Sequence, residues 1–76
     1  MASALHSLAV GDQAHATGQD SSAYGLLSDA TGVGSVALGN VAKAHNNNAI
    51  AVGNTSTVTG LNSIGIGSLA NAAGTQ

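Results

Sequence analysis

Histidine is the residue type of this sequence best suited to hold a metal ion, since no cysteine is present. Histidines stand at His6, His15 and His45. In the repeat described below, about 10 Å separates the backbones of His15 and His45, because they lie two coils apart. That is too far for both to ligate one tetrahedral ion within a single chain. We therefore expect solvated surface histidines and no metal site. The alternative is that copies of the chain around a threefold axis bring equivalent histidines together.

The remaining reactive residues do not form a catalytic arrangement. Asp12, Asp20 and Asp29 are the only acids, and they occupy different places of the repeat, whereas acid–base catalysis needs two groups in one pocket. No serine is flanked by a histidine and an acid in a nucleophile-like arrangement. The segment Gly32-Val33-Gly34 is no phosphate cradle, since neither a following helix nor a P-loop lysine is expected. We predict no catalytic residue, no cofactor and no enzyme activity.

Charge and hydropathy exclude several classes of partner. The 76 residues allow at most one domain, and they carry a net charge of -2 with Lys43 as the only base. Tyr24 is the only aromatic residue, so a basic, aromatic surface for nucleic acid is excluded. No apolar run approaches the roughly 18 residues of a membrane helix. We expect no nucleic-acid partner and no direct membrane insertion by this segment.

The chain repeats itself with a constant 14-residue period and without an insertion. The segment SVALG at residues 35–39 has a close variant at the start of each other frame, and residues 1–6 fill the tail of an earlier frame. The complete frames are 7–20, 21–34, 35–48, 49–62 and 63–76. A fixed period is the signature of a repeat architecture, so it outweighs a small-residue composition that is otherwise typical of linkers.

Two short strands are predicted in each frame. Large apolar residues alternate at the second and fourth places, which puts them on one face of a strand. Small residues such as Ala42 and Ala44 alternate at the eighth and tenth places and indicate a second strand. We predict that the large residues form the core of each coil and face the small ones, which would fill a narrow roll. The predicted core residues are Leu8, Val10, Tyr24, Val36, Leu38, Ile50, Val52, Ile64 and Ile66.

Glycine or asparagine closes both strands, at the fifth and twelfth places. Glycine reaches positive φ without steric cost, and asparagine tolerates it. We predict turns at Gly11, Gly25, Gly39, Gly53, Gly67, Gly18, Gly32, Asn46, Gly60 and Gly74. Each frame then reads as strand, turn, strand, turn, which is one coil of a parallel solenoid whose coils are about 4.8 Å apart.

Frame 21–34 departs most from the pattern. It has Ser22 where the other frames have Leu, Val or Ile, and it carries Tyr24 and Leu27. Either this coil is locally distorted, or Tyr24 fills room that Ser22 leaves and the bulk moves to Leu27.

The apolar residues that a solitary roll of five coils would bury offset only part of its conformational entropy, so an oligomer is expected. Apolar residues at the seventh and thirteenth places either line a subunit interface or cover neighbouring coils. These residues are Leu27, Val41, Leu69, Val33 and Leu61.

Frames of the form S-V-A-L-G-N-x-A-x-A resemble the head repeats of trimeric autotransporter adhesins, the YadA-like heads. The resemblance is strongest over Ser35–Gln76 and covers the whole chain at lower fidelity. It implies an all-β, left-handed parallel β-roll assembled as a homotrimer, although the sequence alone does not determine the hand. We expect residues 1–76 to be a single head domain fragment, since neither a neck, a stalk nor an anchor pattern is seen.

The resemblance also implies a function and a location. Such heads attach bacteria to host cells or to matrix proteins such as collagen or fibronectin, through a distributed, repetitive surface. The location implied is the bacterial cell surface, with outer-membrane anchoring by parts of the parent chain not present here. The alternative is a structural spacer or a self-association module, for autoagglutination or biofilm, without its own host ligand. The candidate ligand-facing residues are Asn40, Lys43, His45, Thr57 and Asn71.

Overall fold

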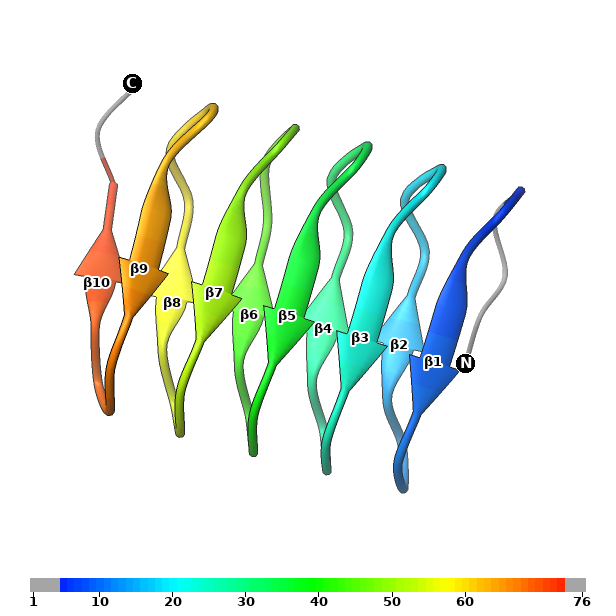
Figure 1. Ribbon diagram of the computed structural model, residues 1–76, viewed down its shortest axis with the longest axis horizontal. Helices are drawn as coiled ribbons and strands as arrows, with labels where there is room; N and C mark the ends of the chain where they lie inside the picture. Colours follow the sequence, from blue (N-terminus) through cyan, green and yellow to red (C-terminus); the bar gives the residue numbers. More distant parts are fainter. Residues whose placement is uncertain (1–4, 74–76) are drawn as a thin grey trace.

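Two parallel sheets, stacked as the two sides of a flat solenoid, make up the computed structural model (Figure 1). The structure describes residues 5–73. Within that range, the chain passes alternately through a first sheet of three-residue strands and a second sheet of two-residue strands. The first sheet contains β1 (Leu8–Val10), β3 (Ser22–Tyr24), β5 (Val36–Leu38), β7 (Ile50–Val52) and β9 (Ile64–Ile66). The second sheet contains β2 (His15–Ala16), β4 (Asp29–Ala30), β6 (Lys43–Ala44), β8 (Thr57–Val58) and β10 (Asn71–Ala72).

Every strand pairs in parallel with the equivalent strand of the neighbouring frame. In the first sheet Ala23 pairs with Ala37, and in the second sheet Ala30 pairs with Ala44. The two strands per coil, the length of the coil and the parallel stacking are therefore confirmed. Hydrogen bonds run both ways between coils: the Leu8 amide donates forward to the Ser21 carbonyl at 3.0 Å, and the Gly25 amide donates back to the Val10 carbonyl at 2.7 Å.

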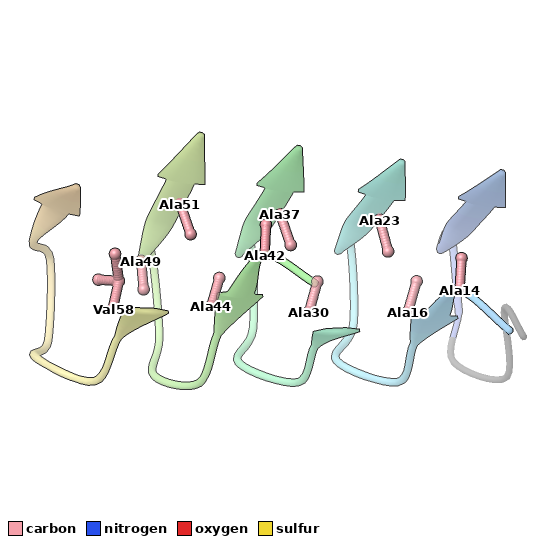
Figure 2. Close-up of a cluster of buried hydrophobic side chains, with 10 residues drawn as sticks. All are labelled: Ala14, Ala16, Ala23, Ala30, Ala37, Ala42, Ala44, Ala49, Ala51 and Val58. Atoms are coloured by element: carbon pink, nitrogen blue, oxygen red, sulfur yellow. The ribbon is translucent and has the colours of Figure 1, made fainter. Parts of the chain in front are cut away.

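The core consists of alanine and serine, not of the large apolar residues. Figure 2 shows alanine side chains from both sheets directed into the space between them. The fully or almost fully buried residues include Ala14, Ala16, Ala23, Ala30, Ala37, Ala42, Ala44, Ala49, Ala51, Val58, Ser21, Ser28, Ser35 and Ser56. Some serines bond locally, as where the Ser63 hydroxyl donates to the Gly60 carbonyl at 2.7 Å.

The predicted core is wrong because the large side chains point outward. Within the part that the structure describes, Leu8, Val10, Tyr24, Leu38, Ile64 and Ile66 are exposed, and Val36, Ile50 and Val52 are half-buried. Alternation with period two shows that the second and fourth places share a face, but it does not say which face is inside. Space decides this. So short a coil brings its two strands so close together that only small side chains fit between them.

One exception shows how tight the interior is. Val58 is fully buried where the other coils have alanine, and glycine replaces alanine at Gly65 in the next coil. A Cβ added to Gly65 would lie 2.9 Å from Cγ2 of Val58. In the preceding coils the equivalent pair is Ala44 and Ala51. The extra volume of Val58 is thus offset by the missing methyl of Gly65.

This compensation predicts that the effect of Gly65→Ala on the free energy of unfolding changes sign when Val58 is replaced by alanine. We expect Gly65→Ala to lower the free energy of unfolding by about 1–2 kcal/mol, because it overpacks against Val58. In a Val58→Ala background the same change should raise it by about 0.5 kcal/mol, because alanine restricts the unfolded chain. Urea unfolding of the four proteins of this double-mutant cycle measures the coupling. Equal effects of Gly65→Ala in both backgrounds would contradict direct packing.

The glycine at the fifth place turns the chain at the end of each three-residue strand. Gly39 has φ 130°, a region that residues with a Cβ rarely adopt. A Cβ at Gly39 would also lie 2.7 Å from the Gly53 carbonyl oxygen of the next coil. Gly11, Gly25, Gly53 and Gly67 have similar angles, as the predicted turn requires.

At the twelfth place the predicted reason for glycine is wrong. Gly18, Gly32 and Gly60 are buried and are not among the residues of positive φ. Gly32 is needed because coils approach closely: a Cβ there would collide with the Asn46 carbonyl oxygen. The positive φ of this corner falls two places later, at residues such as Asn48 and Asn62. Gly74 lies outside the described residues.

Coil 21–34 is not distorted. β3 keeps the same register with β1 and with β5, and Gly25 and Leu27 have φ values of 119° and 58°, close to those of the equivalent residues. Tyr24 is exposed, so it does not fill internal room left by Ser22. This coil differs from its neighbours in outward side chains and not in backbone path.

The seventh place of the coil also has positive φ, and it tolerates residues that are unsuited to it. Val41 has φ 62°, which is unfavourable for a β-branched residue. We expect Val41→Asn to raise the free energy of unfolding by about 1 kcal/mol, because asparagine adopts this conformation at lower cost. Thermal unfolding followed by circular dichroism measures the change. Val33→Asn is the matched control, since Val33 is exposed and is not among the residues of positive φ. An equal gain at Val33 would contradict the backbone explanation.

Candidate functional site

The outer side of the first sheet is a continuous apolar strip, which we call the apolar face. Its residues alternate along each strand with inward-facing small residues, as Val36 and Leu38 flank Ala37. The face consists of Leu8, Val10, Ser22, Tyr24, Val36, Leu38, Ile50, Val52, Ile64 and Ile66. Ile64 and Ile66 are 59% and 70% exposed. A contiguous exposed apolar surface of this kind is typical of an interaction site.

The outer side of the second sheet is polar, and we call it the polar face. His15, Asp29, Lys43, Thr57 and Asn71 lie on it in one row, in register from strand to strand. A second row follows two residues further along each coil, at Thr17, Thr31, His45 and Thr59. The two sides of the solenoid therefore differ completely in chemistry although they enclose the same interior.

The acidic side chain of the polar face lies close to a histidine of the next coil. The Nε2 atom of His45 lies 3.4 Å from Oδ2 of Asp29. Asp29 is also in register with Lys43 on the next strand and with His15 on the preceding strand. Because the Asp29 carboxylate has basic neighbours on both sides, this face presents no strong field of one sign. Exposed pairs of this kind contribute about 0–1 kcal/mol to stability.

The structure brings together four of the five predicted ligand-facing residues. Lys43, Thr57 and Asn71 form consecutive positions of one row on the polar face, and His45 lies one residue beyond β6. Asn40 instead occupies a turn after β5. The five residues do not enclose a pocket as a group, and a ligand role for them stays a prediction.

The histidines are distributed over different coils. His6 Nδ1 lies 3.2 Å from Asp20 Oδ1, at a corner, and His45 pairs with Asp29. Among residues 5–73, no group of three or more His, Cys, Asp and Glu residues could hold a metal ion.

The run Asn46–Asn48 is a corner whose side chains join neighbouring coils. The Asn47 side-chain oxygen accepts a hydrogen bond from the Val33 amide at 3.0 Å. Asn46 Nδ2 donates to the Thr59 carbonyl at 3.1 Å. Asn48 Nδ2 donates to Asn62 Oδ1 at 2.9 Å. These contacts account for the run as a turn, with the side chains engaged within the chain.

The apolar residues of the corners are largely exposed in the single chain. Leu27, Val33, Leu61 and Leu69 are exposed, whereas Val41 is half-buried. A single chain does not test whether they line a subunit interface, so that role stays a prediction. The larger apolar surface, the apolar face, was missed by sequence reasoning because its residues were assigned to the interior.

No helix in the part of the chain that the structure describes is long and apolar enough to cross a membrane.

Comparison with known families shows what the chain is similar to. The model of a family described as YadA head domain repeat (2 copies) matches residues 2–28, 30–56 and 59–76. These segments cover almost the whole chain. Among curated proteins, none matches it. The family suggests a head segment of a trimeric autotransporter adhesin that is exposed at the cell surface, and it is an adhesin-type structural family that is not known for catalysis.

Proposed function

This chain belongs to the YadA head domain repeat family, and from that premise we propose that it attaches a bacterium to host cells or to matrix proteins such as collagen or fibronectin. In this proposal residues 1–76 form a single head domain with a left-handed roll. Three copies assemble around a threefold axis, and anchoring in the outer membrane belongs to other parts of the parent protein.

The observation that carries the proposal is the contrast between the two outer faces. The apolar face consists almost entirely of aliphatic side chains in register, so contact with two further copies would remove it from water. At about 25 cal/mol per Å² of apolar surface, such burial is the dominant source of association free energy. The polar face lies on the opposite side of the solenoid and would remain accessible in a trimer.

Attachment is then assigned to the polar face. The polar face carries short hydrogen-bonding side chains, and Asp29 lies beside His45 on it. Such a surface suits many weak, distributed contacts with an extended partner. Three copies on one axis would strengthen these contacts through avidity.

The test is a binding measurement on the trimer. Light scattering first establishes that the purified chain has the mass of three copies. Binding to immobilised collagen, fibronectin and an inert protein is then measured for the native chain and for Lys43→Ala/His45→Ala/Asn71→Ala. We expect saturable binding to at least one matrix protein and a loss of at least tenfold in the triple variant. Asn40→Ala is the matched control, because Asn40 lies in a turn away from the polar face.

A spacer or self-association module is the second candidate. The regularity of the coils favours it, since every pair of neighbouring coils repeats the same register. A trimer that binds no matrix protein saturably would overturn the attachment role and support this candidate. Concentration-dependent growth of trimers into larger species in the same experiments would identify self-association.

A further inference from the structure

We infer that Ser22 and Tyr24 form a register lock, a polar rung on the apolar face that sets the axial alignment of the assembled copies. The inference rests on the proposed trimer. It concerns the axial alignment of three copies whose apolar faces are nearly uniform. The presence of an apolar face does not by itself explain why one alignment is preferred.

The difficulty arises from the repeat. Each strand of the first sheet presents a pair of outward side chains, and the pair of β5, Val36 and Leu38, differs little from that of β7, Ile50 and Val52. Neighbouring strands are about 4.8 Å apart. A copy displaced by one coil would therefore set one aliphatic pair against another. Apolar contact is non-directional, so most of the apolar face discriminates weakly between the aligned and the displaced assembly.

β3 breaks this uniformity. Ser22 is in register with Leu8 on one side and Val36 on the other, and Tyr24 is in register with Val10 and Leu38. A small polar side chain and a large one with a hydroxyl thus replace two aliphatic side chains. Because the backbone of β3 follows the same path as its neighbours, the difference lies only in what the coil presents to another copy.

Both side chains lack a hydrogen-bond partner in the described part of the chain. Among residues 5–73, neither the Ser22 nor the Tyr24 hydroxyl makes a side-chain hydrogen bond. Tyr24 is 37% exposed and Ser22 is half-buried, so both hydroxyls depend on water in the single chain. Assembly through the apolar face would remove this water, and a buried hydroxyl without a partner is costly.

Alignment of the copies resolves this cost. Under threefold symmetry, Tyr24 of each copy meets the Ser22 level of the next copy. The ring then covers the space above the small serine, and the hydroxyls of the rung are available to one another. In a displaced copy, Tyr24 would meet aliphatic residues such as Leu8 or Val36, and its hydroxyl would be buried without a partner. One unlike rung is sufficient to fix register, as a single buried polar position does in coiled coils.

The experiment compares three sequences that differ in whether the rung is present and in which coil carries it. The first is the native chain. The second is Ser22→Val/Tyr24→Leu, which makes β3 identical to β5 in its outward residues. The third is Ser22→Val/Tyr24→Leu/Val36→Ser/Leu38→Tyr, which moves the rung to the next coil. All three keep the alanine core, so each is expected to fold and to form a trimer by light scattering.

Alignment is read from disulfide trapping. For each sequence, chains with Ile50→Cys and chains with Ile64→Cys are denatured together, refolded and oxidised, and the crosslinks are identified by mass spectrometry. Crosslinks between two copies of position 50 report the aligned trimer. Crosslinks between positions 50 and 64 report a displacement by one coil, because these positions are paired on neighbouring strands.

We expect the 50–64 fraction to be small in the native trimer, to rise at least fivefold in the second sequence, and to return to the native level in the third. An unchanged fraction in the second sequence overturns the lock while leaving the proposed trimer intact. Failure of the third sequence to restore alignment also overturns it, because the effect would then belong to the original position and not to the rung. A native chain without the mass of a trimer overturns the proposed assembly and the lock together.

Discussion

Replacing Ala37 with leucine is expected to prevent the chain from folding into the solenoid. Ala37 is fully buried, and its neighbours in the interior are the methyl groups of other alanines (Figure 2). Three additional carbon atoms have no room unless the two sheets separate. Overpacking costs about 1–3 kcal/mol in ordinary cores and occasionally more. We expect the upper end or beyond, because separation of the sheets would also disturb the ladders between coils.

Circular dichroism and thermal unfolding measure this effect. The matched control is Val36→Leu, which enlarges the adjacent residue on the outer side of the same strand and reproduces the residue of β1 at that place, Leu8. It should change the free energy of unfolding by less than about 1 kcal/mol. The prediction is contradicted if Ala37→Leu unfolds cooperatively with near-native stability while Val36→Leu does not. Ala37 would then face outward and Val36 would face the interior.

Introducing a carboxylate on the apolar face is expected to convert the assembly into single chains. Ile50 lies near the middle of this face, between Val36 and Ile64 in register. In Ile50→Asp the charge would be buried against aliphatic side chains of other copies without a partner, at a cost of several kcal/mol. Association should therefore weaken by more than about a hundredfold.

Light scattering over a range of concentrations checks this prediction. Thr57→Asp is the control, because it places the same charge on the polar face beside Lys43 and should leave the mass unchanged. The backbone of Ile50→Asp can keep its ladders, so a β-type circular dichroism spectrum at low concentration is expected. A variant that retains the mass of three copies would show that the apolar face lies outside the interface.

The coil and its strands could be predicted from sequence because they depend on period. A glycine at the fifth place of every frame, with alternation before it, predicted the strand positions and the parallel register. The choice of interior could not be obtained in this way. Val36 and Ala37 alternate equally well with either facing inward, and preference by hydrophobicity favoured the valine. The deciding quantity is the distance between the two sheets, which depends on the closure of the whole coil.

The candidate site could be predicted only in part, because alternation identifies which residues share a face but not which face is inside. Lys43, Thr57 and Asn71 were expected to face outward because small residues alternate with them, and they do lie together on the polar face. The apolar face was not predicted, because its residues had been placed inside. The roles of glycine divided similarly: positive φ at Gly39 follows from local turn chemistry, whereas the need for glycine at Gly32 comes from the carbonyl of another coil.

An interior of alanine methyl groups has a consequence for calorimetry. Unfolding raises the heat capacity chiefly in proportion to the apolar surface that becomes exposed. Residues such as Ala23 and Ala51 contribute little to this surface, whereas the large side chains are already partly hydrated in a single chain. A single chain should therefore have a small heat-capacity increment per residue and a flat stability curve. Most of the increment should appear only when the copies associate, so that curvature of the stability profile would report assembly and not the folding of the coil.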